Sequence, residues 1–375
     1  MGSTKKKNSL NSARLFHQFT SIWRFNFDVI QSNMSKRTTI QDLAQATGLS
    51  TATVDRALNG RPNVSARAVA RVAEAAEQLG YHASGLARFR AEAATRLSMR
   101  LGFVLQKPKQ AFYQSFAAQL QTAAHARSDI RITCDIRFPQ SQGIDAYASV
   151  IETTAATSDA IAIVAPNHPR LAQLVETIAR SGTPVFTLLN DLAVQHRTAY
   201  FGTDNMKVGR LAAWMLTTLI KQPGELAIFV GSGRWYGHMM RETGFQGYLR
   251  QHAPDFSLLD SIVNLDTRQV TYEATRDLLN RRPHVKGVYV AGGGMEGAIS
   301  ALRELRPPGR VGLVVNELTH ESQTALVDRY VAMVLATPLE ALCRRCINAM
   351  TKTQHDRKDV GQIFLDPSIY LPESF

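Results

Sequence analysis

Residues 39–60 read TIQDLAQATGLSTATVDRALNG, and this stretch predicts two short helices joined by a tight turn. Apolar or small side chains recur at i, i+3, i+4 and i+7 of the first helix: Ile40, Leu43, Ala44 and Thr47. Gly48 then ends that helix, and Ser50 is a favoured N-cap for the second. A third helix is expected between Ser65 and Gly80. Helices this short are stable only when packed together, so the stretch predicts an all-α unit.

The turn Gly48-Leu49-Ser50 has the spacing of a helix-turn-helix unit, in which the second helix enters the major groove of DNA. That helix carries short polar side chains, which permit a close approach, and Arg56, which is long enough to fork onto a guanine edge. Spacing alone does not separate a DNA-binding unit from a generic three-helix bundle with a solvated polar face.

The chain is long enough for two or three domains, with 375 residues, 45% hydrophobic and 20% charged. Its formal net charge of +12 favours a polyanionic partner such as nucleic acid. Residues 1–35 carry +4 of this charge, residues 36–100 carry +5, and the remaining 275 residues carry only +3. The charge therefore predicts a basic DNA-binding head on a nearly neutral body, although a solvated tail would give the same excess.

Residues 1–35 are expected to form a disordered extension, and Met34 is an alternative natural start. The sequence has no run of about eighteen apolar residues, so we expect no membrane role. Three cysteines cannot form a disulfide framework, which favours a reducing compartment. We therefore expect a cytoplasmic, nucleoid-associated protein.

The motifs TIQDLA, GLS, ATV, RALNG and LGY between Thr39 and Tyr81 resemble the headpiece of the lactose-repressor/galactose-repressor (LacI/GalR) family. The resemblance implies a homodimeric, ligand-controlled transcription factor that binds double-stranded, palindromic operator DNA through residues 36–81. By position, the base-facing residues would be Thr51, Ala52 and Arg56. The residues that would contact phosphates or cap helices are Thr39, Ser50, Thr53 and Asn59.

Two features depart from the family pattern. Asp55 stands where the family usually has serine, and its carboxylate would repel phosphate unless it accepts from a cytosine amino group or pairs with Arg56. The segment 82–100 resembles the family's hinge, which wedges a leucine into the minor groove, but Arg90 occupies the leucine position. A basic residue there can contact a narrow minor groove, and the apolar wedge would shift to another side chain. The hinge residues expected at the DNA are Leu86, Arg88, Phe89 and Arg90.

Beyond residue 100, short apolar runs alternate with helical patterns. The expected strands cover 101–105, 130–134, 160–164, 184–188, 226–230, 262–265, 285–290 and 311–315. The first helices between them are expected over 112–126, 144–156 and 171–179. This alternation predicts α/β architecture with parallel sheets, helices on both faces of each sheet, and a ligand at the carboxyl ends of the strands. The alternation occurs in two successive sets of strands and helices, which predicts two α/β lobes.

The motifs FGTDN at 201–205, GR at 209–210, R with GF at 241–245 and NELT at 316–319 resemble the periplasmic sugar-binding-protein fold. The resemblance implies an effector-binding and dimerisation domain over 101–375. Its first lobe would hold about 101–197 and 336–354, and its second about 198–333 and 355–375. The effector-binding residues implied by position are Phe112, Tyr113, Asn190, Arg241, Gly292 and Glu317.

The effector is expected to be a sugar or polyol. Gly292, Ala165 and Thr337 occupy positions where the family commonly has amides, which predicts a pocket with fewer side-chain donors. The sequence therefore also allows a ligand that is smaller, less polar or anionic.

A dinucleotide-binding enzyme is the alternative interpretation. Residues 292–297 read GGGMEG, which satisfies G-x-G-x-x-G after an expected strand, and a carboxylate follows twenty residues later. An NAD-type enzyme would use Gly292, Gly294, Gly297 and Glu317. The motif lies late in the chain and no hydride-transfer partner lies near it, so we expect no enzyme and no cofactor.

The pair Cys343 and Cys346 supplies two ligands where structural zinc needs four, which favours a helix with both thiols packed and no metal. Taken together, the sequence predicts a sequence-specific DNA-binding transcriptional regulator, a repressor, under allosteric control by a small effector.

Overall fold

A computed structural model describes residues 37–84, 87, 97–352 and 361–375. The chain divides into two compact units at residues 96 and 97. The expected N-terminal extension and four expected hinge residues lie outside the described part of the chain. Those four are Leu86, Arg88, Phe89 and Arg90.

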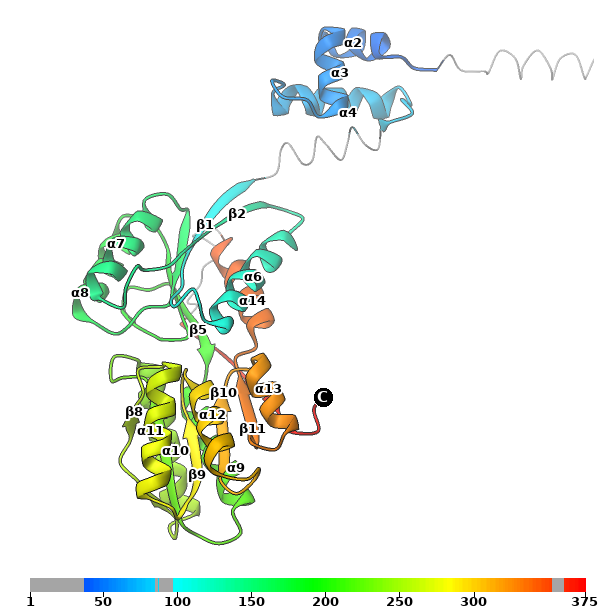
Figure 1. The fold of residues 1–375 in the computed structure, drawn as a ribbon. Helices are drawn as coiled ribbons and strands as arrows, with labels where there is room; N and C mark the ends of the chain where they lie inside the picture. Colours follow the sequence, from blue (N-terminus) through cyan, green and yellow to red (C-terminus); the bar gives the residue numbers. More distant parts are fainter. Residues whose placement is uncertain (1–36, 85–86, 88–96, 353–360) are drawn as a thin grey trace, which may run out of the picture. The chain divides into compact units, whose positions relative to one another are not determined.

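The first unit is the predicted all-α headpiece (Figure 1). Its helices are α2 (Ile40–Thr47), α3 (Thr51–Asn59) and α4 (Ala66–Gln78). Thr39 and Asp42 form a capping box at the start of α2, and the Ser50 side chain accepts the Thr53 amide at the start of α3. Buried side chains from all three helices form one core: Leu43, Val54, Ala57, Leu58, Val72, Ala73, Ala75 and Ala76.

The second unit begins with a six-stranded parallel sheet in the order β12-β5-β4-β3-β1-β2. Its strands are β1 (Ser98–Val104), β2 (Arg131–Arg137), β3 (Ala160–Ile163), β4 (Val185–Leu188), β5 (Ala199–Thr203) and β12 (Gln362–Leu365). The helices that cover it are α6 (Ala111–His125), α7 (Ile144–Ala155), α8 (Pro169–Arg180) and α14 (Leu339–Met350). Helices α6 and α14 pack on one face and α7 and α8 on the other, as predicted for a buried parallel sheet.

The second lobe has a seven-stranded sheet in the order β13-β11-β10-β9-β6-β7, with β8 also paired to β6. The strands are β6 (Glu225–Val230), β7 (Ser257–Leu258), β8 (Ile262–Val263), β9 (Val285–Val290), β10 (Gly312–Asn316), β11 (Met333–Ala336) and β13 (Ser368–Tyr370). Its helices are α9 (Asn205–Leu219), α10 (Tyr236–His252), α11 (Arg268–Arg281), α12 (Met295–Leu305) and α13 (His320–Val327). Only β13 runs antiparallel to its neighbour among the described strands.

The chain passes between the lobes after β5, after β11 and after β12. Two of the predicted lobe boundaries are therefore wrong. Residues 199–203 belong to the first lobe because β5 pairs with β4, and residues 362–365 also belong there because β12 pairs with β5. The physical cause is burial: Ala199, Tyr200 and Phe201 lie inside the first lobe, so the lobe change comes only after Thr203.

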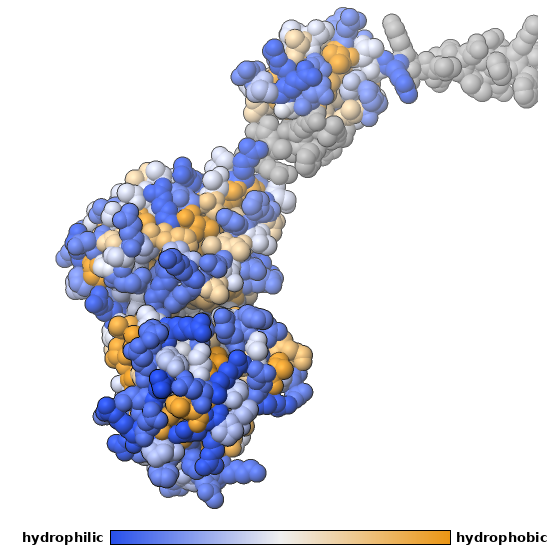
Figure 2. Space-filling view, in the orientation of Figure 1, coloured by the Kyte–Doolittle hydropathy of each residue, from blue (hydrophilic) through white to orange (hydrophobic). Residues whose placement is uncertain are grey.

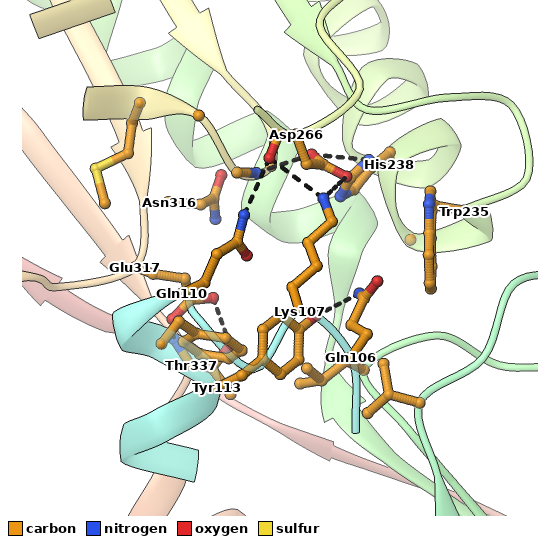
Figure 3. Close-up of a pocket in the computed structure, with 18 of the residues that line it drawn as sticks. Gln106, Lys107, Gln110, Tyr113, Trp235, His238, Asp266, Asn316, Glu317 and Thr337 are labelled. Atoms are coloured by element: carbon orange, nitrogen blue, oxygen red, sulfur yellow. Dashed lines mark hydrogen bonds and ion pairs between the residues drawn. The ribbon is translucent and has the colours of Figure 1, made fainter. Parts of the chain in front are cut away.

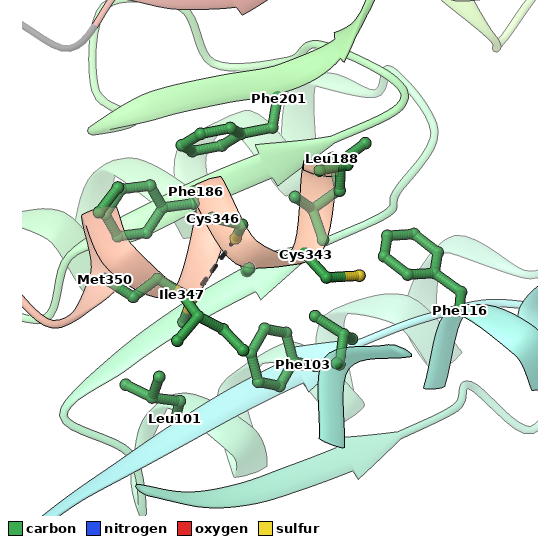
Figure 4. Packing of buried hydrophobic residues seen from close by; sticks show 14 of the residues in the cluster. Leu101, Phe103, Phe116, Phe186, Leu188, Phe201, Cys343, Cys346, Ile347 and Met350 are labelled. Atoms are coloured by element: carbon green, nitrogen blue, oxygen red, sulfur yellow. Dashed lines mark hydrogen bonds between the residues drawn. The ribbon is translucent and has the colours of Figure 1, made fainter. Parts of the chain in front are cut away.

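The cysteine pair of α14 lies in the core of the first lobe (Figure 4). Cys343 and Cys346 are fully buried among side chains such as Phe103 and Phe186, which confirms the packed-helix interpretation. Burial raises the pKa of the Cys343 thiol to about 12, so it stays protonated at neutral pH.

On the face shown in Figure 2, hydrophilic side chains dominate and hydrophobic ones are scattered in small groups. Of the helices that the structure describes, none is long and apolar enough to cross a membrane.

Candidate functional site

The lobes enclose a cavity of about 120 Å³ at the carboxyl ends of their strands, which is where ligands bind in such sheets (Figure 3). The structure brings all six of the sequence-predicted effector residues to its wall. They are Phe112, Tyr113, Asn190, Arg241, Gly292 and Glu317.

Aromatic side chains form one side of the cavity. Phe112 and Tyr113 open helix α6 with their rings 5.0 Å apart, edge to face. The Tyr113 hydroxyl accepts a hydrogen bond from Gln106, so it is held within the first lobe. Trp235 precedes α10 in the second lobe and packs against the core of the first. The cavity therefore has aromatic side chains from both lobes, on which the less polar face of a ring can stack.

Arg241 on α10 is fixed in place by two hydrogen bonds. Its Nε donates to the Asn205 side chain at 2.7 Å, and its Nη1 donates to the Ala291 carbonyl at 2.7 Å. Its Nη2 has no hydrogen-bond partner within the described ranges, so this nitrogen can donate to a molecule in the cavity.

Glu317 follows β10 with a left-handed φ of 69°, which is uncommon for a residue with a side chain. Its carboxylate accepts from the backbone amide of Thr337 at 2.8 Å and from the Thr337 hydroxyl at 2.7 Å. Burial raises the pKa of Glu317, and the nearby Arg241 cation opposes that shift. The lone pairs that remain on this carboxylate are acceptors for a ligand hydroxyl.

Asn190 lies at the end of β4 and bridges the lobes. Its Nδ2 donates to the Ala165 carbonyl and to Asn167 Oδ1, both at 2.7 Å, and its Oδ1 accepts the Gly237 amide from the second lobe at 3.2 Å. The predicted amide group is thus at the cavity, with its strongest contacts already made to protein.

Four charged or titratable residues at the cavity were not predicted from the sequence: Lys107, His238, Asp266 and Glu296. Lys107 and Asp266 each follow a strand, a signal that could have identified them, because ligands bind beyond strand carboxyl ends. The expectation of a pocket with fewer side-chain donors stays a prediction. Gln110, Lys107 and His238 also line the cavity, and the first two donate to backbone carbonyls of the second lobe.

His238 is a neutral imidazole with a defined tautomer. The Gly231 amide donates to its Nδ1 at 3.1 Å, which places the ring proton on Nε2. Burial is the main cause that lowers the pKa of His238, while Asp266 opposes the shift. The ring therefore acts as a donor at neutral pH without adding charge to the cavity.

The glycine run at 292–297 serves protein packing, so the dinucleotide alternative is not supported. A Cβ at Gly292 would overlap the Asp266 carboxylate and the His238 ring. A Cβ at Gly294 or Gly297 would overlap helix α11 or the loop before it, which fits close packing of α12 on α11 and not a phosphate cradle.

The predicted DNA-facing side chains lie on one exposed face of α3. Thr51, Ala52, Arg56 and Asn59 are exposed there, and Thr53 is half-buried with its hydroxyl 2.8 Å from Ser50 Oγ. Thr39 and Ser50 act as helix caps, the second of the two roles expected for them.

Asp55 does not pair with Arg56, which corrects one of the two expectations for this carboxylate. It accepts from Asn59 Nδ2 at 2.7 Å and from Arg61 Nη1 at 3.1 Å. Arg61 was missed because it lies beyond the glycine that ends α3; its side chain is 63% exposed. Together these contacts give the exposed face of α3 a second arginine.

Comparison with known proteins gives the same two units. The lacI family of bacterial regulatory proteins matches residues 39–84, and the periplasmic binding protein domain matches residues 101–353. The HTH-type transcriptional regulator GalR of Salmonella typhimurium (strain LT2) is 26% identical over 314 residues, which cover 80% of this chain and 83% of that protein.

Solved structures resemble the second unit. A glucose-galactose binding protein from Geobacillus stearothermophilus shares 17% identity with a TM-score of 0.68, covering 74% of this chain and 99% of that one. A solute binding protein from Bacillus halodurans with bound myo-inositol shares 16% identity with a TM-score of 0.66, covering 73% and 95%. These likenesses show the fold of the second unit.

A helix-turn-helix headpiece joined to a two-lobed sensor defines a ligand-responsive DNA-binding protein. More specifically, the chain belongs to the periplasmic binding protein domain family and is a transcriptional regulator of the LacI/GalR type.

Proposed function

We propose that this regulator is a repressor whose operator affinity is set by an uncharged sugar or polyol bound between the lobes. One observation carries the proposal. Arg241 Nη2, which has no partner among the described residues, and the Glu317 carboxylate line one cavity together with aromatic side chains. A polyhydroxy compound matches this set because each hydroxyl both donates and accepts.

The charges around the cavity favour a neutral ligand. Lys107 and Arg241 face Asp266 and Glu317, and Glu296 adds a third carboxyl group. With no excess positive charge in the wall, an anion would be bound without a compensating cation and at a desolvation cost. Of the ligand classes left open by the sequence, the cavity thus favours sugars and polyols over sugar acids.

On the DNA side, we propose that α3 lies in the major groove with Arg56 on a guanine edge. Arg61 would contact a phosphate, and Asp55 would hold Arg61 in position. Because each headpiece would contact only one half-site, we expect a homodimer on a palindromic operator. A reducing, cytoplasmic location and the lack of catalytic activity complete the proposal, since the matched family is one of regulatory proteins.

The test has two parts on the full chain. Operator sequences are first selected from random DNA, and the protein is then screened by thermal shift against sugars, polyols and sugar acids, because a specific ligand raises apparent stability. The compound that stabilises the protein should change its operator affinity.

Arg241→Ala should remove that change and leave operator binding without ligand intact. The expected loss is about 1.5–3 kcal/mol for each hydrogen bond from the charged guanidinium, or roughly ten- to 100-fold in effector affinity. Arg250→Ala, an exposed arginine on the same helix, is the matched control. Normal effector response in Arg241→Ala would exclude the proposed site.

A further inference from the structure

We propose that Lys107, Gln110 and Asp266 form a clasp between the lobes, which holds the cleft closed without an effector and so sets how strongly an effector can act. The proposal concerns regulation of the cavity assigned above, and it rests on the proposed function only for its consequence in DNA binding. The three residues are called the cross-cleft clasp below.

The clasp joins the loop after β1 in the first lobe to the loop after β8 in the second (Figure 3). Lys107 Nζ donates to the backbone carbonyls of Leu265 at 3.3 Å and Asp266 at 3.2 Å, and lies 3.7 Å from the Asp266 carboxylate. Gln110 Nε2 donates to the Asp266 carbonyl at 3.1 Å. These contacts are made by protein groups alone, so they contribute to closure whether or not a ligand is present.

Burial makes the clasp stronger than a surface ion pair. The side chains of Lys107 and Asp266 are only 17% and 9% exposed. Exposed ion pairs contribute little because water screens them, whereas removal of one partner from a buried pair leaves an uncompensated charge and is strongly destabilising. Loss of Lys107 would therefore favour the open state, in which Asp266 regains water.

The surrounding structure is shaped to hold Asp266 in this position. The Asp266 amide donates to Asn264 Oδ1 at 3.0 Å, and the Asp266 carboxylate accepts the Gly293 amide at 2.8 Å. A Cβ at Gly231 or Gly292 would overlap that carboxylate. Gly292, one of the glycines that suggested a nucleotide site in the sequence, thus makes room together with Gly231 for an acid that faces the other lobe.

Backbone conformation gives a second sign of a constrained contact. Lys107, Leu265 and Asp266 all have left-handed φ values, of 46°, 53° and 53°. Residues with side chains are held in this region only when their surroundings impose it, and such residues gather at ligand-binding and switching segments. Both loops of the clasp contain them.

Other contacts between the lobes give a way to observe opening. The Asn167 amide in the first lobe donates to the Arg234 carbonyl in the second at 2.8 Å, and the Gly237 amide donates to Asn190 at 3.2 Å. None of these four residues belongs to the clasp. The Asn167 and Gly237 amides are the donors across the cleft, so their exchange with solvent reports on opening at a distance from any change made in the clasp.

The experiment measures amide hydrogen exchange on the full chain without ligand. Lys107→Met and Asp266→Asn are compared with the wild type and with Lys109→Met, an exposed lysine two residues away on the same loop. We expect exchange at the Asn167 and Gly237 amides to become about tenfold faster or more in both clasp variants, because each removes the opposite charge from a buried partner. Lys109→Met should leave it unchanged.

Two results would overturn the clasp. In the first, exchange increases only in the mutated loops and the Asn167 and Gly237 amides stay protected, which would make Lys107 a local contact. In the second, Lys107→Met and Asp266→Asn combined act additively, although residues of one pair should show coupling. Circular dichroism of each variant checks its fold, and Gln110→Ala gives a milder variant with the same expected direction.

The clasp and the proposed function fail separately. Protected amides in the clasp variants reject the clasp even if a sugar is found that controls operator binding. Conversely, a screen that yields no sugar or polyol rejects the proposed effector class. The clasp would still be supported if exchange is faster in its variants.

Discussion

Arg56→Ala is predicted to abolish base discrimination and leave the headpiece folded. Arg56 is exposed on α3, and its guanidinium has no partner among the residues that the structure describes. The substitution therefore removes no intramolecular hydrogen bond, and the free energy of unfolding should change by no more than about 0.5 kcal/mol. Alanine also has the highest helix propensity, so the substitution should not destabilise helix α3.

The effect on DNA follows from geometry. A bidentate arginine–guanine contact is worth about 1–3 kcal/mol of discrimination against the wrong base. A dimer makes the contact in both half-sites, which gives about 2–6 kcal/mol, or from about 30-fold to more than 10⁴-fold in relative affinity. Non-specific affinity should fall much less, since it depends on the phosphate contacts that remain.

The assay is fluorescence anisotropy with a selected operator and with the same operator after its central guanines in each half-site are replaced. The wild type should separate the two sequences by the factor above, and Arg56→Ala should bind both alike at a single salt concentration. Arg250→Ala removes the same charge from the sensor unit and should behave as the wild type. An Arg56→Ala protein that still separates the two sequences would refute the placement of α3.

Three further predictions concern Arg61, the packing of α12 and the cavity histidine. Arg61→Ala should lower the slope of log affinity against log salt by about 0.9 per half-site without changing base preference; an unchanged slope would remove Arg61 from the phosphate contacts. Gly297→Ala should destabilise the protein by about 1–3 kcal/mol in denaturant unfolding, because its Cβ meets the backbone of α11. Gly247→Ala, with open space at its Cβ, should instead gain about 0.5–1 kcal/mol; similar behaviour of the two variants would contradict the packing argument. Because burial lowers the pKa of His238, the unfolded chain takes up the proton first, so this group's contribution to stability is lost as pH falls below about 6.5. His238→Gln should reduce the fall in Tm between about pH 7.5 and pH 5.5, and an equal fall in both proteins would count against a buried neutral ring.

The headpiece was predictable from sequence because local signals define it. The caps at Thr39 and Ser50 and the left-handed glycines at 48 and 60 act within a few residues, and the structure has all of them. The alternation of strands and helices in the sensor is equally local. Hydrophobic periodicity therefore predicts both sets of alternating strands and helices without information on contacts between distant segments.

The lobe boundaries depend on long-range pairing, which the sequence does not report. Strand β12 joins the first lobe because it pairs with β5, more than 150 residues earlier in the chain. Strand β13, only three residues after β12, joins the second lobe by pairing antiparallel with β11. Nothing in the composition of residues 361–375 distinguishes these two partners, since both strands are short and partly exposed.

Asp266 shows the same limit at the site. Its position after a short strand is a local signal, but its direction into the cleft depends on glycines at 231 and 292, which lie on two other strand ends. Spacing alone made Gly292 consistent with a phosphate-binding loop. A Gly-rich turn creates space in either case, and only the neighbouring chain determines whether a ligand or a side chain occupies it.

The clasp also limits the regulation that an effector can produce. A ligand shifts an equilibrium only by its difference in affinity for the two states, and it cannot close a cleft that is already closed. If the clasp keeps a fraction f of the ligand-free protein closed, the effector can raise the closed population by at most 1/f, so a resting fraction of about 10% permits about a tenfold change. Weakening the clasp should then widen the regulatory range and lower effector affinity together, since a smaller closed fraction reduces apparent affinity in proportion. Substitutions in the Lys107–Asp266 pair should therefore lower effector affinity and widen the regulatory range, while the Arg241 and Glu317 contacts stay unchanged.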